Sequence, residues 1–337
     1  MSALSTYPVR KPQWILTYAG VNITGDISRM ALAVVYTDRL GGAAGEIEIE
    51  LEDHDKLWQG PWHPQEGDVT NLMLGYANEA LLPCGDFQVD DLELELPPDV
   101  FRLRCLAAYI TPAMRTLNSV GFENQTLVQI ARTIAAKHNL TLVSAPGLDG
   151  LAFARVTQSR ESDLAFLHRL AQSHDYDFTV RGTQMVFYAR SALESAPPSA
   201  TISRSDLLRG NFRSKTHKIF KAAQVSYQSP ATKHLFTQTI QASPMFAPSD
   251  TLKVIARCEN GQQALVKSQG ALHGANMTQT VASLTLVGNP ALCAGNTIAV
   301  SGFGANDGVY LIDTARHHVS HAQGYTTEID ARQVPES

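Results

Sequence analysis

The sequence is poor in several features that would assign a chain to a special class of protein. It has four cysteines among 337 residues, and 7% of its residues are aromatic. No stretch approaches the roughly 18 uninterrupted apolar residues of a transmembrane helix. The first eleven residues contain no apolar core of a signal peptide. From these absences we predict a chain that is made and kept in a cytoplasm and has no stable membrane anchor.

The cysteines and the charges argue against zinc, disulfide and nucleic-acid functions. The cysteines form no C-x-x-C pair, so we interpret them as small buried apolar residues: Cys84, Cys105, Cys258 and Cys293. The net charge is -5, whereas nucleic-acid-binding domains usually carry a basic excess on one face. The nearest basic group is interpreted as the solvated face of a strand: Arg213, Lys215, Lys218 and Lys221. We therefore predict no sequence-specific binding of nucleic acid.

Alternating polar and apolar residues predict strands in the first third of the chain. The apolar fraction of 44% and the charged fraction of 18% are typical of a globular protein with a core. Residues 46–52 alternate strictly, as in a half-buried strand, and residues 14–35, 87–96 and 101–108 also have strand patterns. Four acidic residues interleave with the apolar ones, which assigns most of them to the outer face rather than to a catalytic carboxylate pair: Asp90, Asp91, Glu93 and Glu95.

The apolar period changes to that of a helix in the middle of the chain. Apolar residues at i, i+3, i+4 and i+7 predict a helix over residues 127–138, with Thr126 as its N-cap and Asn139 as its end. A hairpin is predicted over residues 177–188. Together these patterns predict a small α+β unit.

A second amphipathic helix is predicted over residues 160–173. Ser159 is its predicted cap, and Glu161 and Asp163 fall in its first turn, where the helix dipole favours negative charge. The two acidic residues therefore have a structural role without any catalytic one.

Strand patterns return in the last third, around one further helix at residues 262–273. The predicted fold class is α+β, mainly β. The predicted division is a first β domain over residues 1–110, a small α+β domain over 111–195, and a second β domain over 196–337 that contains the helix.

The two β-rich ends share a pattern of residues in the same order. Each reads G-[DN], a strand, a glycine, a loop, and then G-x-[FY]-x-[VI]-D; the first copy begins at Gly67 and the second at Gly295. Glycines at strand ends with an aromatic residue on an alternating strand are typical of a curved sheet or small barrel. We interpret the pattern as one β module present twice.

The segment between the two copies resembles a family signature. Residues 158–171 read Q-S-R-E-S-D-L-A-F-L-H-R-L-A, which is similar to the Q-x-x-E-S-D-x-x-F-L-x-R-L signature of the phage late control D proteins and of the hub part of type VI valine-glycine repeat spike proteins. Two further stretches resemble the ends of that family: Leu51-Glu52-Asp53 with Trp58, Trp62, Pro64 and Gly67-Asp68, and Gly288-Asn289-Pro290 through Gly324-Tyr325-Thr326-Thr327.

The resemblance implies a baseplate hub of a contractile phage tail or of a headless tailocin such as an R-type pyocin. It implies a homotrimer in which each chain gives two tail-tube-like β-barrels, so that a ring of six similar modules adapts the six-fold tail tube to a three-fold central spike. The implied partners are the tube or tube-initiator protein, the spike, the tape measure, and wedge or sheath-initiator proteins of the baseplate. The resemblance implies no enzyme activity.

Three stretches of the sequence superficially resemble chemical sites, but no catalytic, cofactor-binding or metal-binding residue is predicted. Gly302-Phe303-Gly304 with Gly308 lacks the helix N-terminus that a dinucleotide loop needs. Among His317, His318 and His321, neighbours on a strand point to opposite faces and do not share an ion readily. His54 between Asp53 and Asp55 fits a turn better than a catalytic base. The alternatives kept open are a particle-associated peptidoglycan hydrolase and a DNA-binding regulator.

Overall fold

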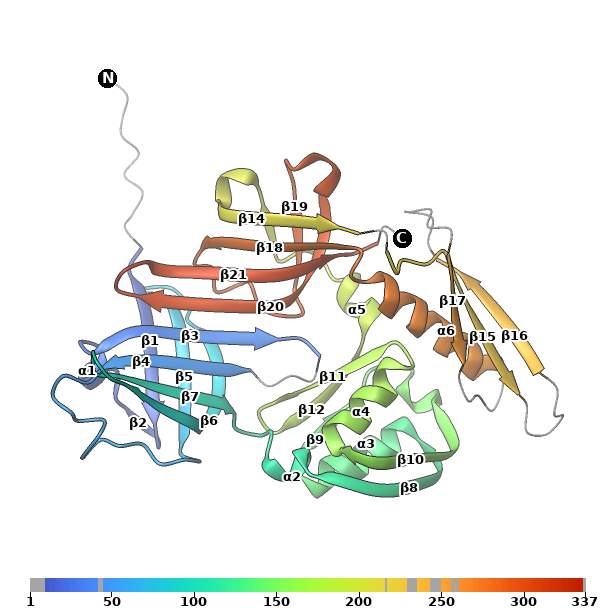
Figure 1. The fold of residues 1–337 in the computed structure, drawn as a ribbon, viewed down its shortest axis with the longest axis horizontal. Helices are drawn as coiled ribbons and strands as arrows, with labels where there is room; N and C mark the ends of the chain where they lie inside the picture. Colours follow the sequence, from blue (N-terminus) through green and yellow to red (C-terminus); the bar gives the residue numbers. More distant parts are fainter. Residues whose placement is uncertain are drawn as a thin grey trace.

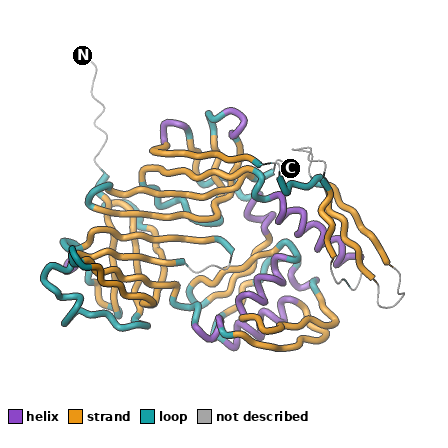
Figure 2. The backbone as a smooth tube through the Cα atoms, viewed as in Figure 1, coloured by secondary structure: helices purple, strands orange, loops and turns teal. Residues whose placement is uncertain are grey.

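The computed structural model describes residues 10–41, 45–215, 217–228, 235–242, 250–255, 258 and 261–335. About half of these residues lie in strands, most of which are antiparallel, and most of the helical segments lie in the middle of the chain or in α6 (Gly261–Asn276) (Figures 1 and 2). The predicted α+β, mainly β class is confirmed. Among the described residues, no helix has the length and apolar character needed to cross a membrane.

The first β module surrounds an apolar core built by the alternation seen in the sequence. Its strands pair in the order β3-β4-β7-β6-β5-β1-β2. The predicted strand at residues 46–52 is β4, and its Ile47 and Ile49 are 0% exposed while its glutamates lie on the other face. The elements of the module are β1 (Pro12–Tyr18), β2 (Val21–Asn22), α1 (Thr24–Ile27), β3 (Ala31–Arg39), β4 (Glu46–Glu52), β5 (Val69–Tyr76), β6 (Leu82–Glu95) and β7 (Val100–Ala107).

The second β module repeats the strand order of the first. Its strands pair in the order β14-β18-β21-β20-β19, which corresponds to β3-β4-β7-β6-β5. Its elements are β13 (Ala200–Ile202), the 3-10 turn Arg204–Asp206, β14 (Leu207–Ser214), β18 (Thr280–Val287), β19 (Thr297–Val300), the 3-10 turn Gly304–Asn306, β20 (Gly308–Ser320) and β21 (Gly324–Gln333). The edge strands β1 and β13 break the correspondence, since β1 lies antiparallel to β5 and β13 lies parallel to β19.

The correspondence extends to single hydrogen bonds. In the first module the Gly67 N–H donates to the Val89 carbonyl, and the Val89 N–H donates to the Asp68 carbonyl, both at 2.9 Å. In the second module Gly295, Ile312 and Asn296 make the same two bonds, again at 2.9 Å. A register shift follows at the same point in each module, between Val89 and Asp91 and between Ile312 and Thr314. The repeat predicted from the sequence is therefore a structural duplication.

A small α+β domain lies between the two modules in the chain. Two helices pack on strands around a separate apolar core that includes Phe122, Ile130, Phe166 and Phe178. The elements are α2 (Pro112–Arg115), β8 (Leu117–Thr126), α3 (Leu127–Lys137), β9 (Thr141–Val143), the 3-10 turn Leu148–Gly150, β10 (Ala152–Ser162), α4 (Asp163–Gln172), β11 (Tyr176–Arg181), β12 (Gln184–Ala189) and α5 (Arg190–Glu194). The predicted hairpin and the N-cap at Thr126 are confirmed, and Thr126 forms a capping box with Gln129.

The start of the second helix was predicted wrongly. The helix begins at Asp163, and its N-cap is Ser162, whose side chain accepts a hydrogen bond from the Ala165 N–H at 3.1 Å. Ser159 lies in β10, where a bulge follows it because Arg160 adopts a positive φ of 52°. Glu161 therefore lies in the last part of β10 instead of in the first turn of the helix, whereas Asp163 does lie there.

A further three-stranded sheet lies inside the last third of the chain. Its strands β15 (Ala222–Gln228), β16 (Leu235–Gln241) and β17 (Thr251–Ile255) pair in the order β16-β15-β17, and α6 packs against them (Figure 1). The basic residues at 213–221 do not share a strand, because β14 ends at Ser214. The domain boundaries at residues 110 and 195 stay a prediction.

Candidate functional site at the junction of the modules

The two β modules are joined by one strand pair. β20 lies antiparallel to β3 over seven residue pairs, from Thr314 opposite Arg39 to Ser320 opposite Ala33. Because each of these strands also pairs within its own module, the junction makes the two modules one continuous 13-stranded sheet (Figure 1). Two corresponding sheets are thus held side by side in one fixed register, which we call the internal seam.

A buried histidine lies at the centre of the internal seam. The imidazole of His317 stacks on Tyr36 of β3, with centroids 5.9 Å apart and planes at 17°. Its Nε2 lies 3.0 Å from the Leu292 carbonyl, and its Nδ1 lies 2.8 Å from the Tyr325 hydroxyl. Nε2–H therefore donates to the Leu292 carbonyl, and in the neutral ring Nδ1 accepts from the Tyr325 hydroxyl. Burial lowers the pKa of His317 to about 4, in agreement with that assignment.

Asp38 ties three parts of the chain together. Its carboxylate accepts a 3.0 Å hydrogen bond from the Ala294 N–H of the second module, and it lies 3.5 Å from the Arg181 guanidinium of the central hairpin. The side chain is buried, and burial raises the pKa of Asp38 against the opposing effects of Arg181 and the Ala294 N–H. A buried carboxylate of this kind is costly unless it is paired, so its partners fix where the three parts meet.

The far side of the first module also contacts the second. The Tyr76 hydroxyl donates to the Gly288 carbonyl at 2.9 Å, and its ring lies 5.2 Å from that of Tyr325. Gly288 has no room for a side chain, because a Cβ there would lie 2.1 Å from Cγ of Tyr325. Tyr325 belongs to β21 but packs into the core of the first module.

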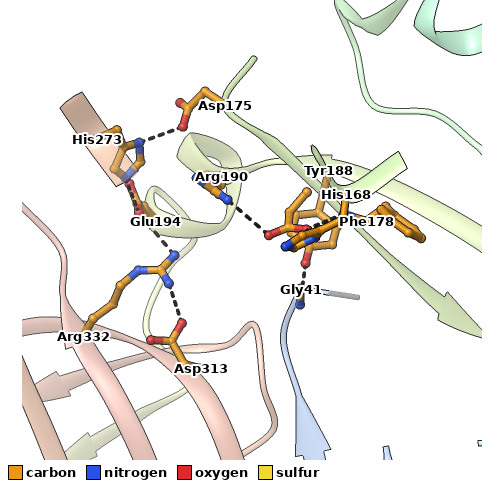
Figure 3. A network of polar contacts seen from close by, with 11 residues as sticks. Gly41, His168, Asp175, Phe178, Tyr188, Arg190, Glu194, His273, Asp313 and Arg332 are labelled. Carbon is orange, nitrogen blue, oxygen red and sulfur yellow. Dashed lines mark hydrogen bonds and ion pairs between the residues drawn. The ribbon is translucent and has the colours of Figure 1, made fainter. Parts of the chain in front are cut away.

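A polar network joins α6 to the central domain and the second module (Figure 3). His273 of α6 lies 2.9 Å from Asp175 through Nδ1 and 2.9 Å from Glu194 through Nε2. Glu194 also lies 3.7 Å from Arg332, which pairs with Asp313 of β20. The hydrogen bond to Asp175, with that to Glu194, raises the pKa of His273 to about 9, so the ring is a cation at neutral pH.

A second branch of the network ties the central domain to the first module. The Tyr188 hydroxyl accepts a 3.1 Å hydrogen bond from the Gly41 N–H, which follows β3 (Figure 3). Beside it, the buried Asp177 lies 3.4 Å from the Arg190 guanidinium and 3.2 Å from Nδ1 of His168. These contacts hold the central hairpin against the end of the internal seam.

The signature segment is a folding motif. Gln158, its first residue, donates at 2.8 Å to Oδ1 of Asp163, which is 2% exposed. Oδ2 of Asp163 lies 2.8 Å from Nζ of Lys137 and 2.7 Å from Nε2 of His138. Burial opposes ionisation, but the hydrogen bonds from these partners outweigh it and lower the pKa of Asp163.

The other signature residues also have structural partners. Glu161 pairs with Arg169 at 2.8 Å, and Phe166 stacks on Phe122 with centroids 5.5 Å apart. The signature thus anchors β10 and α4 to the rest of the central domain.

The motifs that were set aside lie apart from one another. Asp53 is buried and accepts from the Trp58 N–H at 3.0 Å, while His54 is exposed in the same turn. The acidic residues of β6 lie exposed on the outer face, as predicted. Gly302 precedes the 3-10 turn before β20, Gly304 begins that turn, and Gly308 opens the strand. Within the described ranges, no group of three residues is placed to hold a metal ion.

The apolar cavity of the first module does not present a catalytic pair. A cavity of about 330 Å³ opens at one end of the first module's core, and its lining is mainly apolar: Leu16, Tyr18, Ile23, Asp26, Ile27, Ile49, Leu51, Trp58, Trp62, Pro64 and Leu103. Asp26 is the one carboxylate among these lining residues. General acid–base catalysis needs two groups with opposed roles, and this lining does not supply them.

The sequence reasoning missed Asp38, Glu194, His273 and Arg332. Each is a charged or titratable residue placed where elements from different parts of the chain meet. The sequence did contain a hint for Asp38, because this charged residue closely follows an apolar run that ends at Tyr36. None was available for the other three, because their partners lie far away in the sequence.

Comparison with known proteins identifies the fold that carries this junction. The family model described as "Phage tail baseplate hub (GPD)" matches residues 100–323. The chain belongs to this family. The probable baseplate hub protein of Escherichia phage 186 is 30% identical over 205 residues, which cover 60% of this hub chain and 52% of that protein. The hub chain thus spans about half the length of the curated relatives it matches.

Solved structures share the hub fold at low sequence identity. The 43 kDa tail protein of prophage MuSo2 from Shewanella oneidensis has a TM-score of 0.73 and 15% identity, with 96% of this chain and 98% of that chain covered. The E. coli c3393 protein, a component of the type VI secretion system, has a TM-score of 0.58 and 12% identity, with coverage of 96% and 77%. These similarities show the fold of the hub, including the part before residue 100.

Proposed function

We propose that this hub is a structural, non-enzymatic homotrimer that adapts the six-fold tail tube of a contractile particle to a three-fold central spike. The observation that carries the proposal is the duplication: two modules of the same strand order, joined in one register by the internal seam. Three chains with two modules each present six similar units on one side and keep three-fold symmetry on the other. A ring of this kind closes through heterologous interfaces whose rotation returns to the start.

The proposed domains are the two tube-like barrels at residues 1–110 and 196–337 and the α+β domain at 111–195. The proposed partners are the tube or tube-initiator protein, the spike, the tape measure, and wedge or sheath-initiator proteins. The hub assembles in the bacterial cytoplasm and ends in the baseplate of a phage tail or tailocin. The strand pairing and the buried contacts between the modules support this role, because an adaptor must hold its two modules in a fixed relation.

Deletion of the hub gene in the producing strain tests the proposal. We expect particles without complete tails, restored by the gene in trans, when lysates are viewed by electron microscopy. Quantitative mass spectrometry of intact tails should give three hub chains per tail, which is half the number of subunits in a single six-fold tube ring. Normal tails in the deletion strain, or tails that lack the chain, would contradict the proposal.

The alternative, a particle-associated peptidoglycan hydrolase, is tested on the purified chain. We expect no release of soluble fragments from labelled peptidoglycan, with lysozyme as the positive control. Turnover that survives further purification would contradict a purely structural role.

A further inference from the structure

Two strand edges of the hub lack a partner within the described sheets. β14 is the last strand of the 13-stranded sheet, so one of its edges is open. β6 pairs with β5 only as far as Gln88, and the next residue, Val89, still bonds to Asp68. Its outer half, from Asp91 to Glu95, pairs with β7 on one side and has no strand on the other. Open edges of this kind are the sites where a further strand adds to a sheet.

The duplication relates these two edges to the internal seam. β14 corresponds to β3, and β6 corresponds to β20. In the second module, the outer half of β20 is the part that receives β3. The outer half of β6 is thus the same surface in the first module, and β14 is the strand that matches β3.

We propose that β14 of one hub chain adds to the outer half of β6 in the neighbouring chain and repeats the register of the internal seam. This inference rests on the proposed ring, for which it supplies the contact between chains.

The strand pairings show which residues of the two modules are equivalent. On β3 and β14, Arg39 is equivalent to Lys215, Thr37 to Arg213, and Tyr36 to Phe212. On β20 and β6, Thr314 is equivalent to Asp91, Arg316 to Glu93, and His317 to Leu94.

When the register of the internal seam is applied to β14 and β6 of neighbouring chains, residues of opposite charge lie opposite each other. Asp91 falls opposite Lys215, and Glu93 falls opposite Arg213, each pair across two chains. The Glu93 side chain is 62% exposed although it lies 3.4 Å from Arg102, so it can accept a second cation. Arg213 is exposed on β14, and in the described structure its side chain has no ion pair of its own. Directly opposed charges of opposite sign favour one register of a strand pair.

The same register also covers apolar surface. Leu94 falls opposite Phe212, at the position that the stacked His317 and Tyr36 occupy in the internal seam. Leu94 of β6 and Leu96 of the turn that follows are 38% and 57% exposed, and an added strand would cover this apolar surface. Phe212 is half-buried against Phe303 and Tyr310, so its ring is already held in place.

Disulfide trapping in assembled tails tests the proposed register. We would introduce Glu93→Cys and Arg213→Cys into the hub of the producing strain, purify tails and oxidise them. Directly opposed residues in an antiparallel pair lie about 4.5–5.5 Å apart at Cα, within disulfide range. The native cysteines are buried or half-buried, and burial raises the pKa of Cys84, Cys105 and Cys293, which slows their reaction.

The matched control carries Glu93→Cys with Arg209→Cys, which the register places about 13 Å further along the strand. We expect covalent dimers and trimers of the hub from the first pair, in at least about tenfold excess over the control. Equal trapping of both pairs, or no trapping in tails that contain three hub copies, overturns the register while the proposed function stands. Tails that lack the hub overturn both.

A charge-exchange series keeps the inference testable if the cysteine variants do not assemble. Glu93→Arg and Arg213→Glu should each lower the yield of complete tails at least about tenfold, because like charges then face each other. The double variant E93R/R213E should recover most of the yield. If the yield of complete tails is as low in the double variant as in the single variants, the pairing of these residues is overturned.

Discussion

The imidazole of His317 lies stacked on the ring of Tyr36, 5.9 Å away, where the second β module meets the first. The neutral ring uses both nitrogens, one toward Leu292 and one toward Tyr325. The pair lies at the middle of the internal seam, so protonation of His317 directly affects the stability of the contact between the modules.

Acid should weaken the hub through His317. Its pKa falls from 6.5 to about 4 on folding, so the unfolded chain binds the proton more readily between these values. The contribution of His317 to stability is complete above pH 6.5 and is lost as the pH falls toward 4, at up to about 1.4 kcal/mol per pH unit. Urea unfolding at several pH values measures this slope. We expect a smaller slope in His317→Gln, and the wild-type slope in the control His321→Gln, whose ring is exposed. An unchanged slope in His317→Gln contradicts the assignment.

Base should loosen α6 through His273. Its pKa rises from 6.5 to about 9 on folding, so its stabilising effect is complete below pH 6.5 and is lost as the pH rises through 9. The total change is on the order of 3 kcal/mol. Hydrogen exchange of α6, corrected for intrinsic rates, should show reduced protection between pH 7 and 9. His273→Gln should remove this dependence, and His54→Gln should keep it; protection that does not change with pH in the wild type argues against the network.

Asp163→Asn should destabilise the central domain by about 2–4 kcal/mol, because Lys137 and His138 lose the buried charge that they contact. Thermal or urea unfolding measures the loss. Asp149→Asn, at an exposed position of the same domain, is the matched control and should change stability little. Equal stability of the two variants would falsify the role given to the signature segment.

Gly288→Ala should destabilise the contact between the modules by about 1–3 kcal/mol, since the added Cβ overlaps the buried Tyr325 ring. Gly150→Ala is the control, because nothing lies within 4 Å of a Cβ at that position. A shift in melting temperature for Gly288→Ala no larger than that of the control means that Tyr325 moves aside without cost.

The strands and helices could be predicted because their signals are local. The alternation at residues 46–52 and the cap at Thr126 depend on neighbours in the sequence, and both are found in the structure. Ser159 failed as a cap because the bulge at Arg160 shifts the helix start by three residues, which no local pattern shows.

The junction lay beyond prediction for a different reason. His317 was weighed as a metal ligand, but its partners Leu292, Tyr325 and Tyr36 come from three segments that the fold alone brings together. The repeat predicted two modules, whereas the register that joins them is set by contacts between residues far apart in the sequence.

Cryo-electron microscopy of the intact tail tests the central claim most directly. The map should contain three hub chains, whose six β modules form one ring between the tail tube and the spike. Any other number of hub chains, or hub density outside the tube–spike junction, would contradict the account.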